Sequence, residues 1–248
     1  MQSSYTIQLK YMLIKLLQRP IHITAFCNEE YTFANNYAPI QRASKFVPSW
    51  WKNLPKSKWD FDKFERVNTA KSCIGMIETF KNGYVMPMWC DLALKILPDD
   101  YIRYQFSDKI SQLQFHPKEQ AQDFLPNHYF IKLKSPWTLK SSENLKYMFS
   151  PPTFFNSDNP PYLIPSSVNA TTDKIMATHV FLLIEKQDTP IEIFLKFNTP
   201  LVHYVPITEK PIKFTTEVIS VSEYNKMIYP FIGIQFNGRG LKVSKTNN

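Results

Sequence analysis

The sequence predicts a mainly β protein: an antiparallel β-sandwich with jelly-roll character, an irregular aromatic-rich N-terminal arm and one or two short helices. Three observations support this class. Short apolar segments separated by Pro, Asn and Asp recur along the second half of the chain, as in sandwiches and barrels. The 248 residues are 44% hydrophobic, which is enough for one sizeable core. Only 5 Gly stand against 19 Pro, so the Gly-rich phosphate loops of Rossmann and P-loop proteins are excluded.

The first element is an amphipathic helix over residues 4–18, because apolar residues at helical spacing share one face. A strand that begins near Met12 is the alternative. Pro20 ends either element, and residues 21–26 then alternate apolar and polar side chains as a half-buried strand does.

Residues 28–68 show little periodicity but contain three tryptophans, Trp50, Trp51 and Trp59. This composition predicts an irregular arm packed by aromatic side chains, with Trp50 and Trp51 closing the open end of the sandwich. A contact with a partner is the alternative, and Trp50, Trp51 and Lys52 are then candidate partner-binding residues.

Thr69 is a good N-cap for a helix over residues 70–81, and Asn82-Gly83 supplies the left-handed stop that helix ends favour. Residues 84–97 fit one long strand, followed by the turn Pro98-Asp99-Asp100 and a strand over 101–106. Seven further strands are expected from here to the C-terminal region. They are Tyr129–Lys134, Lys146–Phe149, Thr178–Glu185, Ile191–Phe197, Leu201–Pro206, Thr215–Val221 and Ile228–Phe236.

The predicted organisation is an N-terminal helix or strand plus arm over residues 1–68, a sandwich over 69–236 that forms one unit with the arm, and a basic tail over 237–248. In that tail Arg239, Lys242 and Lys245 are further candidate partner-binding residues, which can contact phosphate or a neighbouring subunit.

The net charge of +8 is spread along the chain rather than concentrated on one element, and Lys greatly outnumbers Arg. Nucleic acid is therefore possible but not the favoured partner. The three cysteines, Cys27, Cys73 and Cys90, form no CxxC pair, so we expect neither a zinc knuckle nor a disulfide framework. We expect the protein to fold in a reducing compartment. No signal peptide or transmembrane segment is expected either.

Five histidines are available for metal chemistry, but none stands two residues before Asp or Glu, the usual start of a jelly-roll iron site. They are His22, His116, His128, His179 and His203. The sequence therefore assigns no catalytic, metal-binding or cofactor-binding residue, and no cofactor.

Cys90 beside Asp91 is the strongest candidate nucleophile, with His179 or His203 as a distant base. A structural role is favoured, since free Cys in apolar stretches is commonly a small core residue. We expect Cys73, Trp89, Asp91 and Trp137 to be structural, and a half-buried Asp91 to pair with Lys, Arg or backbone N–H groups of the preceding helix.

Four segments of the sequence stand out together: Pro48-Ser49-Trp50-Trp51-Lys52-Asn53-Leu54-Pro55, Thr69-Ala70-Lys71-Ser72-Cys73, Asn82-Gly83-Tyr84-Val85-Met86-Pro87-Met88-Trp89-Cys90-Asp91 and Lys134-Ser135-Pro136-Trp137. In this order and spacing they resemble an uncharacterised family of mainly marine tailed-phage proteins, whose members carry P-x-W-W-K-x-L-P, T-x-K-x-C, G-Y-x-x-P-x-W-x-D and K-x-x-x-P-W. The similarity spans roughly residues 20–210.

The segment Asn198-Thr199-Pro200-Leu201 resembles the same family's G-T-P-L turn, with Asn198 in place of glycine. Asn is the next best residue for a positive φ, so a left-handed conformation is expected at Asn198. The resemblance implies a viral origin and a self-contained β-rich module.

The sequence therefore predicts a non-enzymatic viral structural or assembly protein that acts through contacts with other subunits, such as capsid or tail components, and for which an oligomer is possible. Its expected location is the virion or the host cytoplasm. The alternatives are a jelly-roll Fe(II)-dependent oxygenase and a module that binds carbohydrate or nucleic acid.

Overall fold

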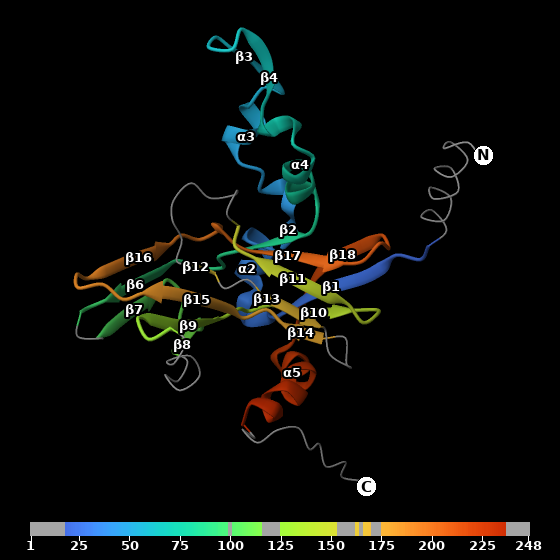
Figure 1. The fold of residues 1–248 in the computed structure, drawn as a ribbon. Helices are drawn as coiled ribbons and strands as arrows, with labels where there is room; N and C mark the ends of the chain where they lie inside the picture. Colours follow the sequence, from blue (N-terminus) through green and yellow to red (C-terminus); the bar gives the residue numbers. More distant parts are fainter. Residues whose placement is uncertain are drawn as a thin grey trace.

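The computed structural model describes residues 18–98, 101–115, 125–152, 162–163, 166–169 and 175–236, with only the backbone of 162–163, 166–169 and 229–236. Strands dominate these residues and most pair antiparallel, which confirms the predicted mainly β class (Figure 1). The α-helices are α2 (Thr32–Tyr37), α3 (Ser49–Asn53), α4 (Ile74–Lys81) and α5 (Val221–Phe236). Of the helices described, none has the length and apolar character needed to cross a membrane.

One layer of the sandwich contains two four-stranded sheets that continue into each other. Its strands are β1 (Ile21–Asn28), β8 (Gln112–Phe115), β9 (His128–Lys134), β10 (Thr138–Ser141), β12 (Tyr162–Leu163), β14 (Ile175–Ala177), β15 (Val180–Glu185) and β18 (Ile212–Ile219). The strand orders are β14-β10-β1-β18 and β12-β15-β9-β8. Because β15 pairs with β9 and β14 pairs with β10, these strands form one bent ribbon, with bends at residues 135–137 and 178–179.

The other layer repeats this arrangement. Its strands are β2 (Gln41–Arg42), β5 (Tyr84–Pro87), β6 (Leu92–Ile96), β7 (Ile102–Phe106), β11 (Lys146–Ser150), β13 (Ser166–Asn169), β16 (Ile191–Leu195) and β17 (Pro200–Ile207). The orders are β13-β11-β17-β5-β2 and β16-β6-β7. The single strand predicted over 84–97 is wrong, because the chain bends at residues 88–91 and its two halves lie in different sheets.

The core lies between the two layers. The Tyr84 ring stacks on Phe214 across the layers at 4.1 Å, and the Ser135 hydroxyl donates to the Met86 sulfur at 3.2 Å. Trp89 and Trp137, one at a bend in each layer, are 2% and 0% exposed. Truncation of a buried aromatic of this size to Ala generally costs roughly 3–5 kcal/mol, so Trp89 and Trp137 contribute strongly to the stability of the whole fold.

Residues 43–81, which we name the arm, leave the sandwich after β2 and return at β5. They form a 3-10 helix (Ala43–Lys45), α3, the hairpin β3 (Ser57–Asp60) and β4 (Glu65–Asn68), a second 3-10 helix (Ala70–Ser72) and α4. Figure 1 shows the arm projecting from the sandwich with the hairpin at its far end and α5 on the opposite side. The arm thus consists of short helices and one hairpin, and it includes the Trp-rich part of the predicted arm together with the predicted helix over 70–81.

A small core of its own supports the arm. Ala43, Phe80 and Val85 are fully buried together, and Trp51 packs against them with its ring 4.9 Å from that of Phe80. Since Val85 belongs to β5, this core joins the arm to the sandwich. The prediction that Trp50 and Trp51 close the open end of the sandwich is therefore wrong: Trp51 packs in the arm.

The helix predicted over 70–81 is found with a break at Cys73, which separates the second 3-10 helix from α4. Thr69 caps it by accepting from the Lys71 N–H at 3.2 Å, and Gly83 follows with a φ of 77°. Both predicted helix signals are confirmed.

The strand predicted over Ile228–Phe236 is wrong, because these residues belong to α5. The sequence signal for the start of this helix is a capping box formed by Ser220 and Glu223. The Glu223 carboxylate accepts from the Ser220 N–H at 3.2 Å and from its hydroxyl at 2.8 Å, while the Glu223 N–H donates to the Ser220 hydroxyl at 3.2 Å. Three predicted features lie outside the described residues: residues 4–17 of the N-terminal helix, the turn residues Asp99 and Asp100, and the tail with Arg239, Lys242 and Lys245.

Candidate functional site

The most exposed large aromatics of the arm lie at residues 59–64, which we name the hairpin tip. Trp59 is 51% exposed, Phe61 77% and Phe64 79%. Burial of such side chains is favourable by roughly 1.5–3 kcal/mol each, so their exposure leaves a large part of that free energy available for binding. Exposed aromatics that gather in one place mark an interaction site.

The turn of the tip is organised by Asp60. Its Oδ1 accepts from the N–H groups of Asp62 at 3.0 Å and Lys63 at 3.2 Å, the typical pattern of an Asx turn. Phe64 then closes the turn with a φ of 53°. A bulky residue in this left-handed region costs roughly 1–2 kcal/mol relative to a right-handed conformation. Because the Phe64 side chain is exposed, packing within the described part of the chain does not offset this cost.

The hairpin around the tip carries no net charge. Residues 57–68 contain three basic and three acidic side chains, which are interspersed with the aromatics. A surface that binds a nucleic-acid backbone concentrates basic residues, whereas aromatic residues surrounded by both signs of charge are typical of a protein interface.

The hairpin is fixed to the rest of the arm by hydrogen bonds. Lys71 Nζ donates to the carbonyls of Trp51 and Lys52, both at 2.8 Å, and lies 4.3 Å from the centre of the Trp51 ring. The Thr69 hydroxyl donates to the Pro55 carbonyl, and the Thr69 N–H donates to that of Lys56 at 3.0 Å. Lys71 thus provides a hydrogen-bond donor to carbonyl groups at the C-terminal end of α3, while Thr69 ties together the two ends of the hairpin.

Of the partner-binding residues predicted from the sequence, the three that the structure describes lie on α3, between the sandwich and the hairpin tip (Figure 1). Trp50 is 46% exposed with its ring 6.4 Å from that of Phe80, Lys52 is exposed, and Trp51 is partly buried. Sequence reasoning missed Phe61 and Phe64. The signal available was two phenylalanines inside a run of charged residues, where no strand or helix pattern accounts for them.

The residues predicted to be structural have different surroundings. Trp137 and Trp89 are buried in the core, and Trp89 Nε1 donates to the Ser111 hydroxyl at 2.9 Å. Asp91 is half-buried, and its Oδ1 accepts from the Phe197 N–H at 2.7 Å. The partner of Asp91 is thus a backbone group of the segment between β16 and β17, not of the preceding helix. Cys73 is exposed, so its prediction as a core residue is wrong.

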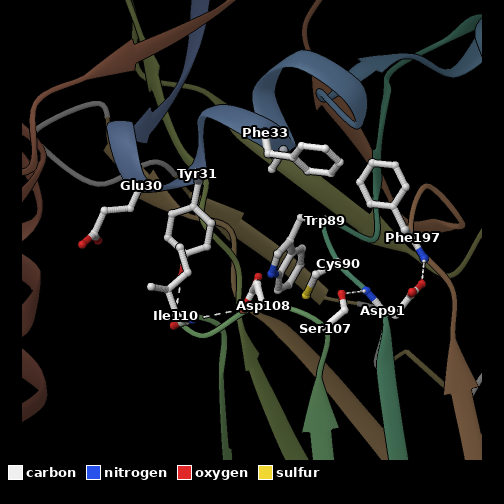
Figure 2. Close-up of a pocket in the computed structure, with 11 residues that line it drawn as sticks. Glu30, Tyr31, Phe33, Trp89, Cys90, Asp91, Ser107, Asp108, Ile110 and Phe197 are labelled. Carbon is white, nitrogen blue, oxygen red and sulfur yellow. Dashed lines mark hydrogen bonds between the residues drawn. The ribbon is translucent and has the colours of Figure 1, made fainter.

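Cys90 borders a pocket of about 440 Å³ between the segment that follows β1 and the bend at residues 88–91 (Figure 2). Phe33 and Phe197 both line this pocket, with their ring centres 5.4 Å apart. Burial raises the pKa of the Cys90 thiol to about 12, against the lowering effect of a hydrogen bond with Ser111. The thiolate is therefore scarce at neutral pH, which makes Cys90 a poor nucleophile.

The described histidines lie on separate elements. His22 is exposed on β1, His128 begins β9, and His179 lies in a bend. His203 is buried on β17, where its Nε2 donates to the Asn82 carbonyl at 2.8 Å at the base of the arm. His116 lies outside the described residues. Within the ranges described, His, Cys, Asp and Glu side chains nowhere form a group of three that could hold a metal ion.

The chain matches none of the protein-family models, curated proteins and solved structures with which it was compared.

Proposed function

We propose that the protein is a non-enzymatic viral assembly protein that binds another protein subunit through the hairpin tip. The observation that carries the proposal is the exposure of Trp59, Phe61 and Phe64 at the far end of a projecting arm. Aromatic side chains of this kind dominate the binding free energy of protein interfaces.

The way the arm is held supports the same function. A binding loop that is already ordered loses less conformational entropy when it meets its partner. The ties from Lys71 and Thr69, together with the small core around Phe80, fix the base of the hairpin before binding. The tip is then presented in one conformation, as an assembly contact requires.

The resemblance to the tailed-phage family supports the viral setting and suggests capsid or tail subunits as partners. The four segments that carry the resemblance contain residues that hold the fold together. Two contain Trp51 and Lys71, which hold the arm together, and two contain Trp89 and Trp137, which fill the bends of the sandwich. The resemblance thus concerns the parts that support the tip.

The test is quantitative mass spectrometry of purified virions of the virus that encodes the chain. We expect the protein at a fixed copy number relative to the major capsid protein. A chain found in infected cells but missing from virions and from their assembly intermediates would refute the function.

A carbohydrate-binding module is the second candidate, because the pocket beside Cys90 combines aromatic rings with carboxylates. Phe33, which is 61% exposed, lines the pocket together with Glu30 and Asp91. Sugar rings stack on aromatic faces, and their hydroxyls donate to carboxylates. A glycan array with the wild-type chain and Phe33→Ala checks this: binding that Phe33→Ala removes would favour the module.

A further inference from the structure

β18 is an edge strand. It pairs in parallel with β1 over eight residues, and no described strand lies on its other side. The pairing joins residues that are far apart in the sequence, with the hydroxyls of Thr24 and Thr215 3.2 Å apart. A long edge with unpaired N–H and C=O groups is a template for a further strand.

The direction of the free backbone groups follows from one hydrogen bond. The Ile21 N–H donates to the Pro211 carbonyl at 2.8 Å, so the backbone of residue 211 points toward β1. Backbone groups alternate in direction along a strand, so the odd-numbered residues of β18 bond to β1. The even-numbered residues from 212 to 218 therefore direct their N–H and C=O groups outward.

The side chains of β18 alternate as well. Lys213, Thr215 and Glu217 are exposed on the outer face of the sheet. On the core face, Ile212, Phe214 and Val218 pack against the main core but stay only partly buried. Within the described part of the chain, neither Lys213 nor Glu217 forms an ion pair. The edge thus presents half-covered apolar side chains and two unpaired opposite charges.

We propose that β18 pairs with β18 of a second copy of the chain, antiparallel and centred on Thr215. Lys213 of each copy then lies opposite Glu217 of the other, so two cross-strand ion pairs form. Phe214 lies opposite Thr216, and residue 212 opposite residue 218, as hydrogen-bonded pairs that use the outward backbone groups. The contact is the same on both copies, as a two-fold dimer requires.

Charge complementarity selects this register. A pairing centred on Phe214 places Lys213 opposite Thr215, and one centred on Thr216 places Lys213 opposite Ile219. Neither brings opposite charges together. Opposite charges that face each other on adjacent strands stabilise the pair, and like charges destabilise it.

The dimer joins two four-stranded sheets into one continuous sheet and covers the half-buried apolar edge. The arm of each copy takes no part in this contact, since the arm extends from β2 and β5 in the other layer. The inference goes beyond the proposed assembly function and does not depend on it, because the dimer is measured on the isolated protein.

Sedimentation equilibrium of the isolated protein tests the dimer. We expect wild type to reach twice the chain mass of 29.2 kDa. Lys213→Glu and Glu217→Lys each place like charges opposite each other twice, so each raises the dissociation constant by about tenfold, which corresponds to about 1.4 kcal/mol. Lys146→Glu reverses an exposed charge on β11 and is the matched control, which leaves the constant unchanged.

Compensating charge reversals test this register specifically. The double variant Lys213→Glu/Glu217→Lys restores two opposite-charge pairs and dimerises like wild type. An equimolar mixture of the two single variants forms a heterodimer for the same reason. Thr216→Pro removes an outward N–H without touching the β1 ladder, so it gives a monomer with an ordinary unfolding transition. A monomeric wild type, single reversals that dimerise like wild type, or a mixture that stays monomeric would each overturn the proposal.

Discussion

Phe64 shows how the tip departs from what folding alone favours. Its φ of 53° lies in the left-handed region, and its ring is 79% exposed. Glycine and asparagine adopt this conformation at little cost, whereas a bulky aromatic does so only under constraint. A residue that lowers stability while contacting little of its own chain is best explained by a role outside the fold.

Phe64→Gly should therefore stabilise the protein slightly. Relief of roughly 1–2 kcal/mol of backbone strain outweighs the extra entropy of glycine in the unfolded chain, about 0.4–1 kcal/mol. We expect a gain of up to about 1 kcal/mol in the free energy of unfolding, measured by urea titration with Phe61→Gly as the control. A loss of stability at Phe64→Gly would mean that the ring packs within the chain.

Cysteine accessibility provides a second check at the residue scale. Cys73 is exposed, while Cys27 and Cys90 are buried, and burial raises the pKa of both of these thiols to about 12. A thiol reagent at pH 8 should modify one of the three cysteines in the native protein and all three in urea. Mass spectrometry of the labelled peptide should place that label on Cys73. Rapid native labelling of Cys90 would contradict the surroundings described for it.

At the scale of elements, the bends control how the two layers fit together. The predicted positive φ at Asn198 is confirmed at 64°, and the Asn198 N–H donates to the Met88 carbonyl at 2.8 Å across the ribbon. In the other layer the Thr178 hydroxyl donates to the Trp137 carbonyl at 2.7 Å. The conformation of Asn198 was predictable because the resemblance marks a glycine turn at this position, and Asn is the next best residue for a positive φ.

Other elements could not be predicted because their local patterns are ambiguous. Residues 84–90 are all buried, so no change of period marks where β5 ends and the bend begins. Aromatic and β-branched residues near the C-terminal end of α5 favoured a strand over the helix that the Ser220 and Glu223 capping box starts. The tip aromatics belong to no periodic pattern.

His179 makes the bend of β14 and β15 sensitive to pH. Burial, with smaller contributions from Lys132 and Lys134, lowers the pKa of its imidazole from 6.5 to about 4. The unfolded chain thus binds a proton that the folded chain does not between these values, so stability decreases as the pH falls from about 6.5 to about 4. His179→Gln should reduce this slope in melting experiments, and His22→Gln, at an exposed position, should not. If stability depended on pH equally in wild type and His179→Gln, His179 would not be the cause of this pH dependence.

At the scale of the whole molecule, the sandwich is the stable base from which the arm projects, and the arm carries the exposed aromatics of the hairpin tip. Sequence periodicity showed which face of a strand is buried, but not which strand lies beside it. β1 and β18 are neighbours although Thr24 and Thr215 are 191 residues apart in the chain. Such pairing depends on the packing of the complete core, so the parallel pair and the free edge of β18 became visible only in the structure.

The central claim is that the hairpin tip is the assembly contact, and the most direct measurement is incorporation of a tip variant into particles. The double variant Phe61→Ser/Phe64→Gly removes both rings, and Phe194→Ser, at an aromatic residue of β16 that is 57% exposed, is the matched control. Interface aromatics cost about 2 kcal/mol or more when truncated, so particles should contain at least tenfold less of the tip variant. The control should be incorporated like wild type, and all three chains should show cooperative melting. A folded tip variant that enters particles at the wild-type copy number would contradict the account.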